Sequence, residues 1–498
     1  MDGFLYKFGM DRCLFSKSSV QTVSERQTEN RGKNPYMKTT VKSLGTVILG
    51  AGLFINGCAK KQMTSFQSLK NPEVAAQLKS FVAEKEAQAN AATNAAAPGF
   101  APFFAAAERG DWLAVSNAFK GMRQHAGQYE HTGKTDERLQ GPQWEAVKEI
   151  WGAFYFFGAG DEKYSTAYAN DIIASIPPGS IYFGGTDPGR FLITGMEKSQ
   201  VNADPFFLLT QNALADSTYL DYLRGIYGGR IYIPTSDDAA KCFQDYTEDA
   251  QKRLQSHQLK PGENVSTDAS GKLQVSGQMA VTQIDGLLAK ITFDKNPGRE
   301  FYVEESFPFD WMYPYLEPHG LIMKINRQPM ANLSDEIVQA DQDYWTKYMA
   351  PMIGGWLKPD TTLAETAAFA EKVYAKKDLS GFTGDTRFIQ SADAQKMFSK
   401  LRSSQAGVYA WRLKQAADPA EKERMASAAD FAFRQAWTLC PYSPEAVFRS
   451  VNLLIEQKRV ADALLVAETA AQMPAMQGVN GTQVRALVEQ LKKFQKAK

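Results

Sequence analysis

Polar side chains follow three stretches of this sequence that have the composition of buried β-strands. The stretches are 180–184, 205–211 and 300–307, and each is rich in β-branched or aromatic residues. In a parallel sheet the carboxyl ends of the strands meet at one edge, where ligands usually bind. We therefore expect the polar side chains that follow these strands to converge on one rim. The candidate ligand-binding residues are Asp187, Arg190, Asn212, Asp216, Glu304, Glu305, Asp310 and Trp311.

Two carboxylates beside an aromatic ring would suit a carbohydrate. Glycosidic chemistry needs an acid and a base or nucleophile about 5–9.5 Å apart, and a sugar ring can stack on Trp311. The commoner role of such residues is structural. Aspartates cap helices and turns, Glu304 and Glu305 would alternate between the two faces of a strand, and the i,i+4 spacing of Tyr344 and Tyr348 is typical of a buried stripe.

Strands and helices alternate through the middle of the chain. Alternation over about 20 to 40 residues predicts units of the βαβ type. The fold class that we expect is an α/β middle domain at 177–330, with a mostly parallel sheet and flanking α-helical segments. Its further elements are helices at 219–227, 237–257 and 281–293, a brief strand at 230–234, a hairpin within 259–277 and a last strand at 321–327.

Three segments of this middle part carry a family resemblance. They are IPPGSIYFGGTDPGRF (176–191), FFLLTQNALADSTYLDYL (206–223) and REFYVEESFPFDWMYPYLEPHGLIMKI (299–325). They resemble the soluble tail of bacterial multi-pass proteins described as mannosyltransferase-like and of unknown function. In that family a strand ends in a Gly-x-Asp turn, as at Gly185 to Asp187 here. The sequence lacks the membrane domain of that family, so the resemblance implies a detached accessory domain and no catalytic residue.

The N-terminal region contains an export signal. Residues 1–36 are polar and unpatterned, and we interpret them as an upstream mis-start before Met37. Residues 37–57 then combine a basic start, an apolar run too short to span a membrane and small residues before Cys58. This resembles the lipobox of bacterial lipoproteins, which implies lipidation of Cys58 and a cell-envelope location, outer membrane or periplasm-facing. A buried apolar helix with a core cysteine is the alternative.

The C-terminal part, 331–498, is predicted to be helical and contains a repeat. Ala429, Phe433 and Ala436 are followed 34 residues later by Ala463, Ala467 and Ala470. Pro441 ends the first of these segments, and Pro474 lies one residue short of the same register. This resembles tetratricopeptide repeats, which implies a partner protein bound through the helical repeats. A generic bundle of helical hairpins is the alternative. We interpret residues 58–102 as a tether and 103–176 as a helical lead-in.

The composition excludes several classes of function. Lys and Arg number 56 against 55 Asp and Glu, so we expect no nucleic-acid partner. Only four His and four Cys are present, and the GxSxG, HExxH, paired CxxC and Walker motifs are absent. We therefore expect no metal and no cofactor. Cys242 and Cys440 could form a disulfide or remain free thiols.

The function predicted from these observations is that of a membrane-anchored extracytoplasmic scaffold without catalytic residues, bound to a partner protein. The alternative is a carbohydrate-binding or glycan-processing envelope protein that uses the carboxylates at the strand ends. Whether any catalysis occurs stays open at this point.

Overall fold

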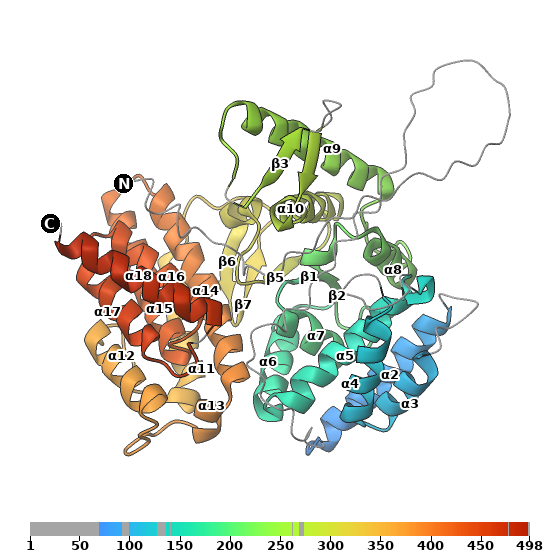
Figure 1. The fold of residues 1–498 in the computed structure, drawn as a ribbon, viewed down its shortest axis with the longest axis horizontal. Helices are drawn as coiled ribbons and strands as arrows, with labels where there is room; N and C mark the ends of the chain where they lie inside the picture. The colour runs from blue at the N-terminus through green and yellow to red at the C-terminus, as the bar shows by residue number, and fades with distance from the viewer. Residues whose placement is uncertain are drawn as a thin grey trace.

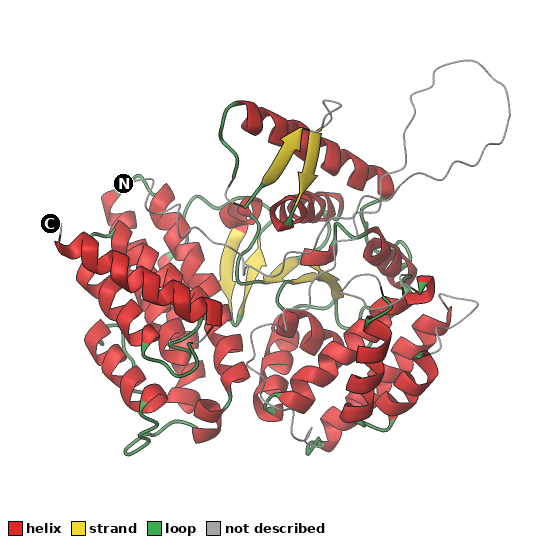
Figure 2. Ribbon diagram, in the orientation of Figure 1, coloured by secondary structure: helices red, strands yellow, loops and turns green. Residues whose placement is uncertain are grey.

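A small β-sheet lies at the centre of the molecule, between two groups of helices (Figure 1). The computed structural model describes residues 69–91, 99–126, 136–139, 141–260, 262–267, 273–476 and 478–496. Helices predominate in these residues (Figure 2), and an α/β core with helical flanks is present, as predicted. The interpreted mis-start, the signal segment and Cys58 lie outside the described residues.

The central sheet is mixed, with strand order β2-β1-β5-β7-β6. β1 pairs in parallel with β2 and β5, whereas β7 is antiparallel to both β5 and β6. This corrects the expectation of a mostly parallel sheet. β6 and β7 are joined by a tight turn at Gly320 (φ 58°), which leaves no room for a crossover helix. The strands are β1 (Ile181–Gly184), β2 (Phe207–Thr210), β5 (Phe301–Glu304), β6 (Leu316–His319) and β7 (Ile322–Ile325).

Two segments differ from their predicted structure for local reasons. The sequence does not predict β6, because Pro318 lacks a backbone donor, but an edge strand tolerates proline. Residues 230–234 are predicted as a strand and belong to none. The N–H of Tyr232 donates to the side-chain oxygen of Asn296 (2.8 Å), and its carbonyl accepts from the Asn296 amide (3.0 Å). One asparagine thus satisfies the backbone groups that a neighbouring strand would satisfy.

Both faces of the sheet are buried. Because side chains alternate along a strand, Tyr182, Leu208 and Tyr302 enter an apolar core that they share with the N-terminal helices. The intervening residues, such as Phe207 and Phe301, enter a second core. Strands buried on both faces need apolar residues at nearly every position, which is why these runs were recognisable in the sequence.

The N-terminal helices include one inside the expected tether. Val74, Leu78, Phe81 and Val82 recur at helical spacing and are at most 5% exposed, so this part of 58–102 belongs to the core rather than to a linker. The helices are α2 (Pro72–Ala91), α3 (Phe100–Glu108), α4 (Trp112–Arg123), η2 (Glu137–Leu139), α5 (Gln143–Ala159), α6 (Glu162–Ser175) and α7 (Asp187–Met196).

An arm projects from the central domain between β2 and β5 (Figure 1). A two-stranded antiparallel hairpin packs there on two helices around a small core of its own, and the predicted hairpin is therefore confirmed. The elements of this region are η3 (Gln211–Ala213), α8 (Ser217–Tyr227), α9 (Ser236–Gln255), β3 (Asn264–Thr267), β4 (Leu273–Ser276), α10 (Gln278–Lys295) and, after β5, η4 (Asp310–Tyr315).

The C-terminal part is helical among its described residues. Its longest helix, α14, contacts β6, β7, α6, α13, α15 and α16, and both Cys242 of the arm and Cys440 of this part are buried free thiols. The elements are α11 (Asp335–Ile353), α12 (Leu363–Ala370), the π-helical turn η5 (Glu371–Ala375), α13 (Thr386–Gln390), α14 (Ala392–Gln415), α15 (Pro419–Leu439), α16 (Pro444–Glu456), α17 (Val460–Ala471) and α18 (Gly478–Lys496).

A buried ion pair fastens α14 to α11. Both oxygens of Asp341 accept hydrogen bonds from Nη1 of Arg402 (2.9 and 2.7 Å), and the hydroxyl of Tyr409 donates to the same carboxylate (2.7 Å). Gln405 donates to the carbonyls of Gly320 and Ile322, at 2.9 Å each. The polar side chains of α14 therefore connect the sheet to the C-terminal helices.

A second set of ion pairs joins the N-terminal helices to the C-terminal ones at the surface. Asp161 accepts from the Arg387 guanidinium (2.9 Å), and Asp385 accepts from Lys163 (2.5 Å) and from the Tyr164 hydroxyl (2.7 Å). Lys163 and Arg387 are about half exposed, so water screens these pairs and each contributes little. They nevertheless align α6 with α13.

We expect Asp341→Ala to destabilise the protein by about 3–5 kcal/mol, because it leaves the Arg402 charge buried without a partner. Chemical unfolding of both variants measures this loss. Asp343→Ala on the exposed side of the same helix is the matched control and should change the free energy of unfolding by less than about 0.5 kcal/mol. Equal effects of the two substitutions would contradict a structural role for the pair.

Candidate functional site

The carboxyl ends of β1 and β5 form the centre of the predicted rim. β1 lies between β2 and β5, so the strand order reverses beside β1. In such sheets ligands usually bind at the carboxyl ends of the strands, at the point where the strand order reverses. The Thr186 N–H donates to Oε2 of Glu304 (3.0 Å) and its hydroxyl donates to Oε1 (2.8 Å). Thr186 also caps α7 by accepting from the N–H of Gly189 (3.1 Å). The Glu304 carboxylate therefore ties β5 to the start of α7.

Glu305 makes the corresponding connection to β2. Its Oε2 accepts from the side-chain amides of Asn212 (2.7 Å) and Gln211 (3.1 Å), and its Oε1 accepts from the Phe307 N–H (3.2 Å). Asn212 also donates to the carbonyl of Gly185 (2.8 Å). The structure thus brings Asn212, Glu304 and Glu305 together, as predicted, and each carboxylate joins segments that are distant in sequence.

The two glutamates explain the glycines of the 184–190 turn. A Cβ on Gly189 would lie 1.6 Å from Oε2 of Glu304, and one on Gly185 would lie 2.3 Å from Oε2 of Glu305. These separations are far below van der Waals contact. The carboxylates therefore occupy the space that side chains at these two positions would fill.

Burial raises the pKa of Glu304 to about 7, and the nearby charge of Glu305 adds to the rise. Hydrogen bonds from the N–H and the hydroxyl of Thr186 oppose it. A carboxyl group with such a pKa could exchange a proton near neutral pH. Glu304 is only 2% exposed, however, so a substrate has no direct approach to it.

C-terminal helices cover the rim. The hydroxyl of Ser404 in α14 donates to the Glu305 carbonyl, and the Arg449 guanidinium in α16 donates to the Ser306 carbonyl (2.6 Å). Lys400 pairs with Glu445 (3.1 Å) beside them. The position where a ligand is expected is therefore an internal contact between two parts of the chain.

The remaining candidates do not form one site. Asp187 is partly exposed at the start of α7, and burial raises its pKa against the opposing charges of Arg190 and Lys400. Asp216 caps α8 through the Thr218 N–H (2.9 Å), and Asp310 is exposed.

Trp311 packs against an aromatic cluster instead of presenting a free face. Its ring centroid lies 5.3 Å from that of Phe293 and 6.2 Å from that of Tyr315. Tyr344 and Tyr348 stack on each other in α11 at 5.5 Å. The aromatic residues are thus used in packing, which was the commoner explanation.

Arg190 belongs to a buried charged cluster that its sequence context does not predict. Its guanidinium lies 3.5 Å from Glu145, which also pairs with Lys148 (2.5 Å). Nearby, Lys85 is fully buried and pairs with Glu149 (2.6 Å). The signal was present in the sequence, since Glu145, Lys148 and Glu149 recur at helical spacing within the otherwise apolar helix α5.

Glu197 borders the Lys85 pair and has no hydrogen-bond partner for either carboxylate oxygen among the described residues. It is 2% exposed. Burial raises its pKa well above the usual value, and the charges of Glu149, Glu84 and Asp204 add to this, while Lys85 opposes it. Burial therefore favours the protonated form of Glu197.

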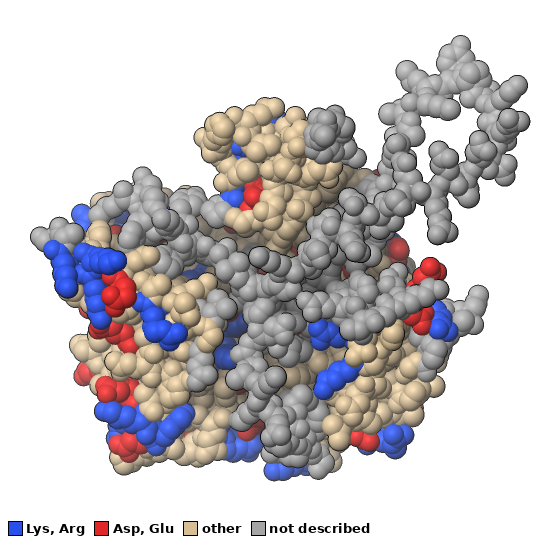
Figure 3. Space-filling view, viewed as in Figure 1, with Lys and Arg blue, Asp and Glu red and all other residues tan. Residues whose placement is uncertain are grey.

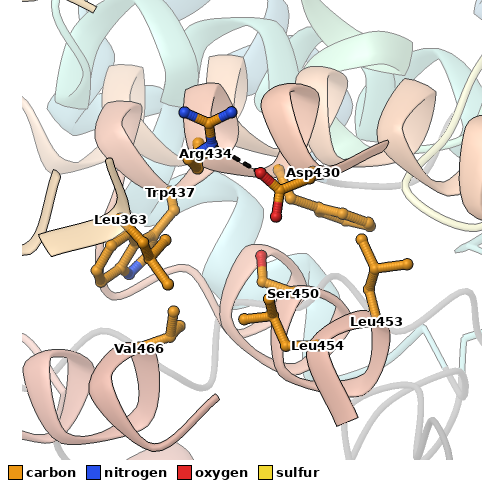
Figure 4. A pocket seen from close by; sticks show the side chains of 9 residues that line it. Leu363, Asp430, Arg434, Trp437, Ser450, Leu453, Leu454 and Val466 are labelled. Atoms are coloured by element: carbon orange, nitrogen blue, oxygen red, sulfur yellow. Dashed lines mark hydrogen bonds and ion pairs between the residues drawn. The ribbon is translucent and has the colours of Figure 1, made fainter. Parts of the chain in front are cut away.

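A small cavity lies between the C-terminal helices (Figure 4). Leu363, Trp437 and Val466 approach it from three helices, with Asp430 and Ser450 at its border. It admits the centre of a water-sized sphere over only about 10 Å³, which is room for one water. It offers no space for a substrate.

The described residues contain neither a helix long and apolar enough to cross a membrane nor a cluster of three metal-ligating side chains. Comparisons with known proteins give no relative: no protein-family model, no curated protein and no solved structure matches this chain.

We expect Gly189→Ala to destabilise the protein, because the added methyl group collides with the Glu304 carboxylate. The double variant Gly189→Ala/Glu304→Ala should lose less stability than the sum of the single losses, by about 0.5–3 kcal/mol. Urea unfolding of the three variants measures the coupling. Gly225→Ala, in α8 with open space around it, is the control and should stabilise by up to about 1 kcal/mol. Additive losses would contradict the close contact.

We expect Glu197→Gln to stabilise the protein increasingly as pH rises from 5 to 8. The pKa of Glu197 is higher in the folded protein than in the unfolded chain. The contribution of protonated Glu197 to stability is therefore complete below the unfolded-state pKa and is lost as the pH rises toward the folded-state pKa. Glutamine mimics the protonated form at every pH. Unfolding temperatures measured across this range test the trend, and exposed Glu73→Gln in α2 should show none.

Proposed function

We propose that this protein is a lipid-anchored scaffold of the bacterial cell envelope that binds a partner protein and performs no catalysis. One observation carries the proposal: the strand-end rim is covered by the chain's own helices, and Glu304 and Glu305 are engaged in joining structural elements. A rim that is buried in this way fits a structural role better than a role in substrate binding.

The membrane anchor is supported by the sequence around Cys58. The basic start, the short apolar run and the small residues before the cysteine have the order of a lipoprotein signal. Acylation of Cys58 would attach the folded part to an envelope membrane.

The repeat-like character of the C-terminal part is supported by equivalent positions in α15 and α17. Ala429 and Ala436 in α15, and Ala463 and Ala470 in α17, are all fully buried. α14 contacts α15, α16 contacts α17, and α18 contacts α17, as successive helices do in a repeat stack. We infer tetratricopeptide-like hairpins, with α18 as the closing helix.

The partner-binding surface that we favour is the exposed side of α18. α14 and α16, which would line the inner face of the stack, are occupied by the α/β domain. Lys and Arg side chains gather near the end of α18 (Figure 3), where Lys493 and Lys496 are exposed. An acidic protein surface would complement this helix.

A carbohydrate-binding or glycan-processing role is the alternative. It is favoured by the pKa of Glu304, which suits a general acid. The low exposure of Glu304 and the packing of Trp311 weigh against it. Calorimetric titration with envelope glycans tests it, and binding that is lost in Asp187→Ala would favour this alternative over the scaffold.

We expect a specific partner to be recovered when the tagged full-length protein is crosslinked in cells and purified from membranes. Arg485→Glu on the exposed side of α18 should reduce recovery several-fold, whereas Lys79→Glu on exposed α2 should not. In parallel, a clickable fatty acid should label the wild type and Cys242→Ser but not Cys58→Ser. Absence of any specific partner, or labelling of Cys58→Ser, would overturn the corresponding part of the proposal.

A further inference from the structure

Three arginines lie at the end of the sheet opposite the rim. Arg299 precedes β5 by two residues and Arg327 follows β7 by two. Because Phe301 pairs with Ile325 in the antiparallel ladder, continuing that register sets Arg299 opposite Arg327. Arg299 also donates to the carbonyl of Arg230 (3.3 Å), which brings the third arginine to the same end. We call these three residues the arginine strip.

The arginine strip lies over aromatic residues of one core. Arg327 sits 3.9 Å from the ring centroid of Phe293, while Arg299 and Arg230 lie 5.1 and 5.6 Å from that of Phe207. Phe207 and Phe293 both belong to the second core. The three cations are therefore grouped over the same side of the sheet, where like charges at close range repel one another.

None of these arginines has a carboxylate within ion-pairing distance among the described residues. Their donors reach backbone carbonyls instead: Arg327 donates to Phe293 (2.9 Å) and Arg299 to Gly179 (3.1 Å). Arg402 and Arg434, by contrast, have an acidic partner, whereas the buried Arg412 also donates only to backbone carbonyls. The strip is therefore a concentration of positive charge without an internal counter-charge.

Two acidic residues close to the strip in sequence, Glu300 and Asp294, are engaged elsewhere. Glu300 accepts hydrogen bonds from Lys324 (2.8 Å) and from the Tyr302 hydroxyl (3.2 Å), whose side chains belong to the opposite face of the sheet. Asp294, which acts on Arg327 from a distance, has both oxygens bound by Lys290 (2.6 and 2.7 Å). Partial burial lowers the pKa of Arg327, because the protein around it solvates the charge less well than water does.

Arg327 also borders a groove with a volume of about 430 Å³. Lys324, Asn326 and Gln328 supply polar groups to its walls, and Met330 supplies an apolar one. The Glu300 carboxylate also lines the groove, where Lys324 pairs with it (2.8 Å). Small-molecule sites commonly have volumes of about 300–1,000 Å³. The groove therefore has the size for a compact ligand next to the Arg327 guanidinium, which has no ion-pair partner among the described residues.

We propose that the arginine strip and this groove bind a phosphate-bearing ligand. The planar guanidinium fork matches two phosphate oxygens, and the carbonyl and aromatic contacts hold the arginines in position before a ligand arrives. The phosphate belongs either to a soluble phosphate ester or to a phospholipid headgroup. This site lies away from the rim and from α18, so it does not depend on the scaffold role.

Calorimetric titration of the full chain carrying Cys58→Ser, which prevents acylation, tests the site. The probes are inorganic phosphate, glycerol 3-phosphate and a short-chain phosphatidylglycerol below its micelle concentration. We expect saturable binding of at least one probe, and weaker binding at high salt. Binding of the lipid alone identifies a headgroup site, whereas binding of glycerol 3-phosphate identifies a soluble ester.

The variant Arg299→Gln/Arg327→Gln should bind at least about ten-fold more weakly, because it removes two charge-assisted contacts. Arg109→Gln, an exposed arginine at the end of α3, removes a charge elsewhere and should bind normally. Arg327→Lys keeps the charge without the fork and serves if the double variant does not fold; it should weaken binding several-fold. No heat with any of the three probes, or unchanged affinity in the arginine variants, would overturn the proposal.

Discussion

Helix α14 carries several buried polar side chains that need hydrogen-bond partners. The positions of those partners determine how the C-terminal helices pack on the sheet. Arg402, Gln405 and Arg412 are at most 3% exposed, and an unpaired buried polar group is costly. Each finds its partners on a different element: Asp341 in α11, the carbonyls around the β6–β7 turn, and the carbonyl of Leu316. The C-terminal helices are consequently held against the sheet in one orientation.

This orientation decides what happens at the strand ends. In an open α/β sheet the reversal point beside β1 would face solvent and could take a ligand. Here α14 and α16 reach that point and bond to the carbonyls of Glu305 and Ser306. The two glutamates link three segments of the α/β domain, and the glycines of the 184–190 turn leave the space that their carboxylates fill. The strand-end residues that the sequence marks as candidate ligand-binding residues thus connect structural elements of the protein to each other.

The local sequence pattern predicts most strands and helices correctly. It fails where a residue that is distant in the sequence changes the local structure. The runs around Phe183, Leu208 and Val303 were recognisable because strands buried on both faces need continuous apolar residues. Residues 230–234 have a strand-like composition, but the side chain of Asn296 takes the backbone bonds of Tyr232. The composition of α2 resembles that of a linker. Its apolar residues between Val74 and Val82 nevertheless pack α2 against α5 and α7, which contribute apolar residues to the same core.

The sequence by itself determined most strands and helices of the middle part and the polar residues at the strand ends, because these depend on periodicity and local composition. It also predicts a lipoprotein-like segment before Cys58. Only the tertiary structure decided that the rim is covered, that Arg190 pairs with Glu145, and that Arg230, Arg299 and Arg327 gather at the far end of the sheet. Strand register and helix docking determine which distant side chains contact each other. The hydrogen bonds and ion pairs at those contacts then determine whether a carboxylate or guanidinium has a partner within the fold or is available to a ligand.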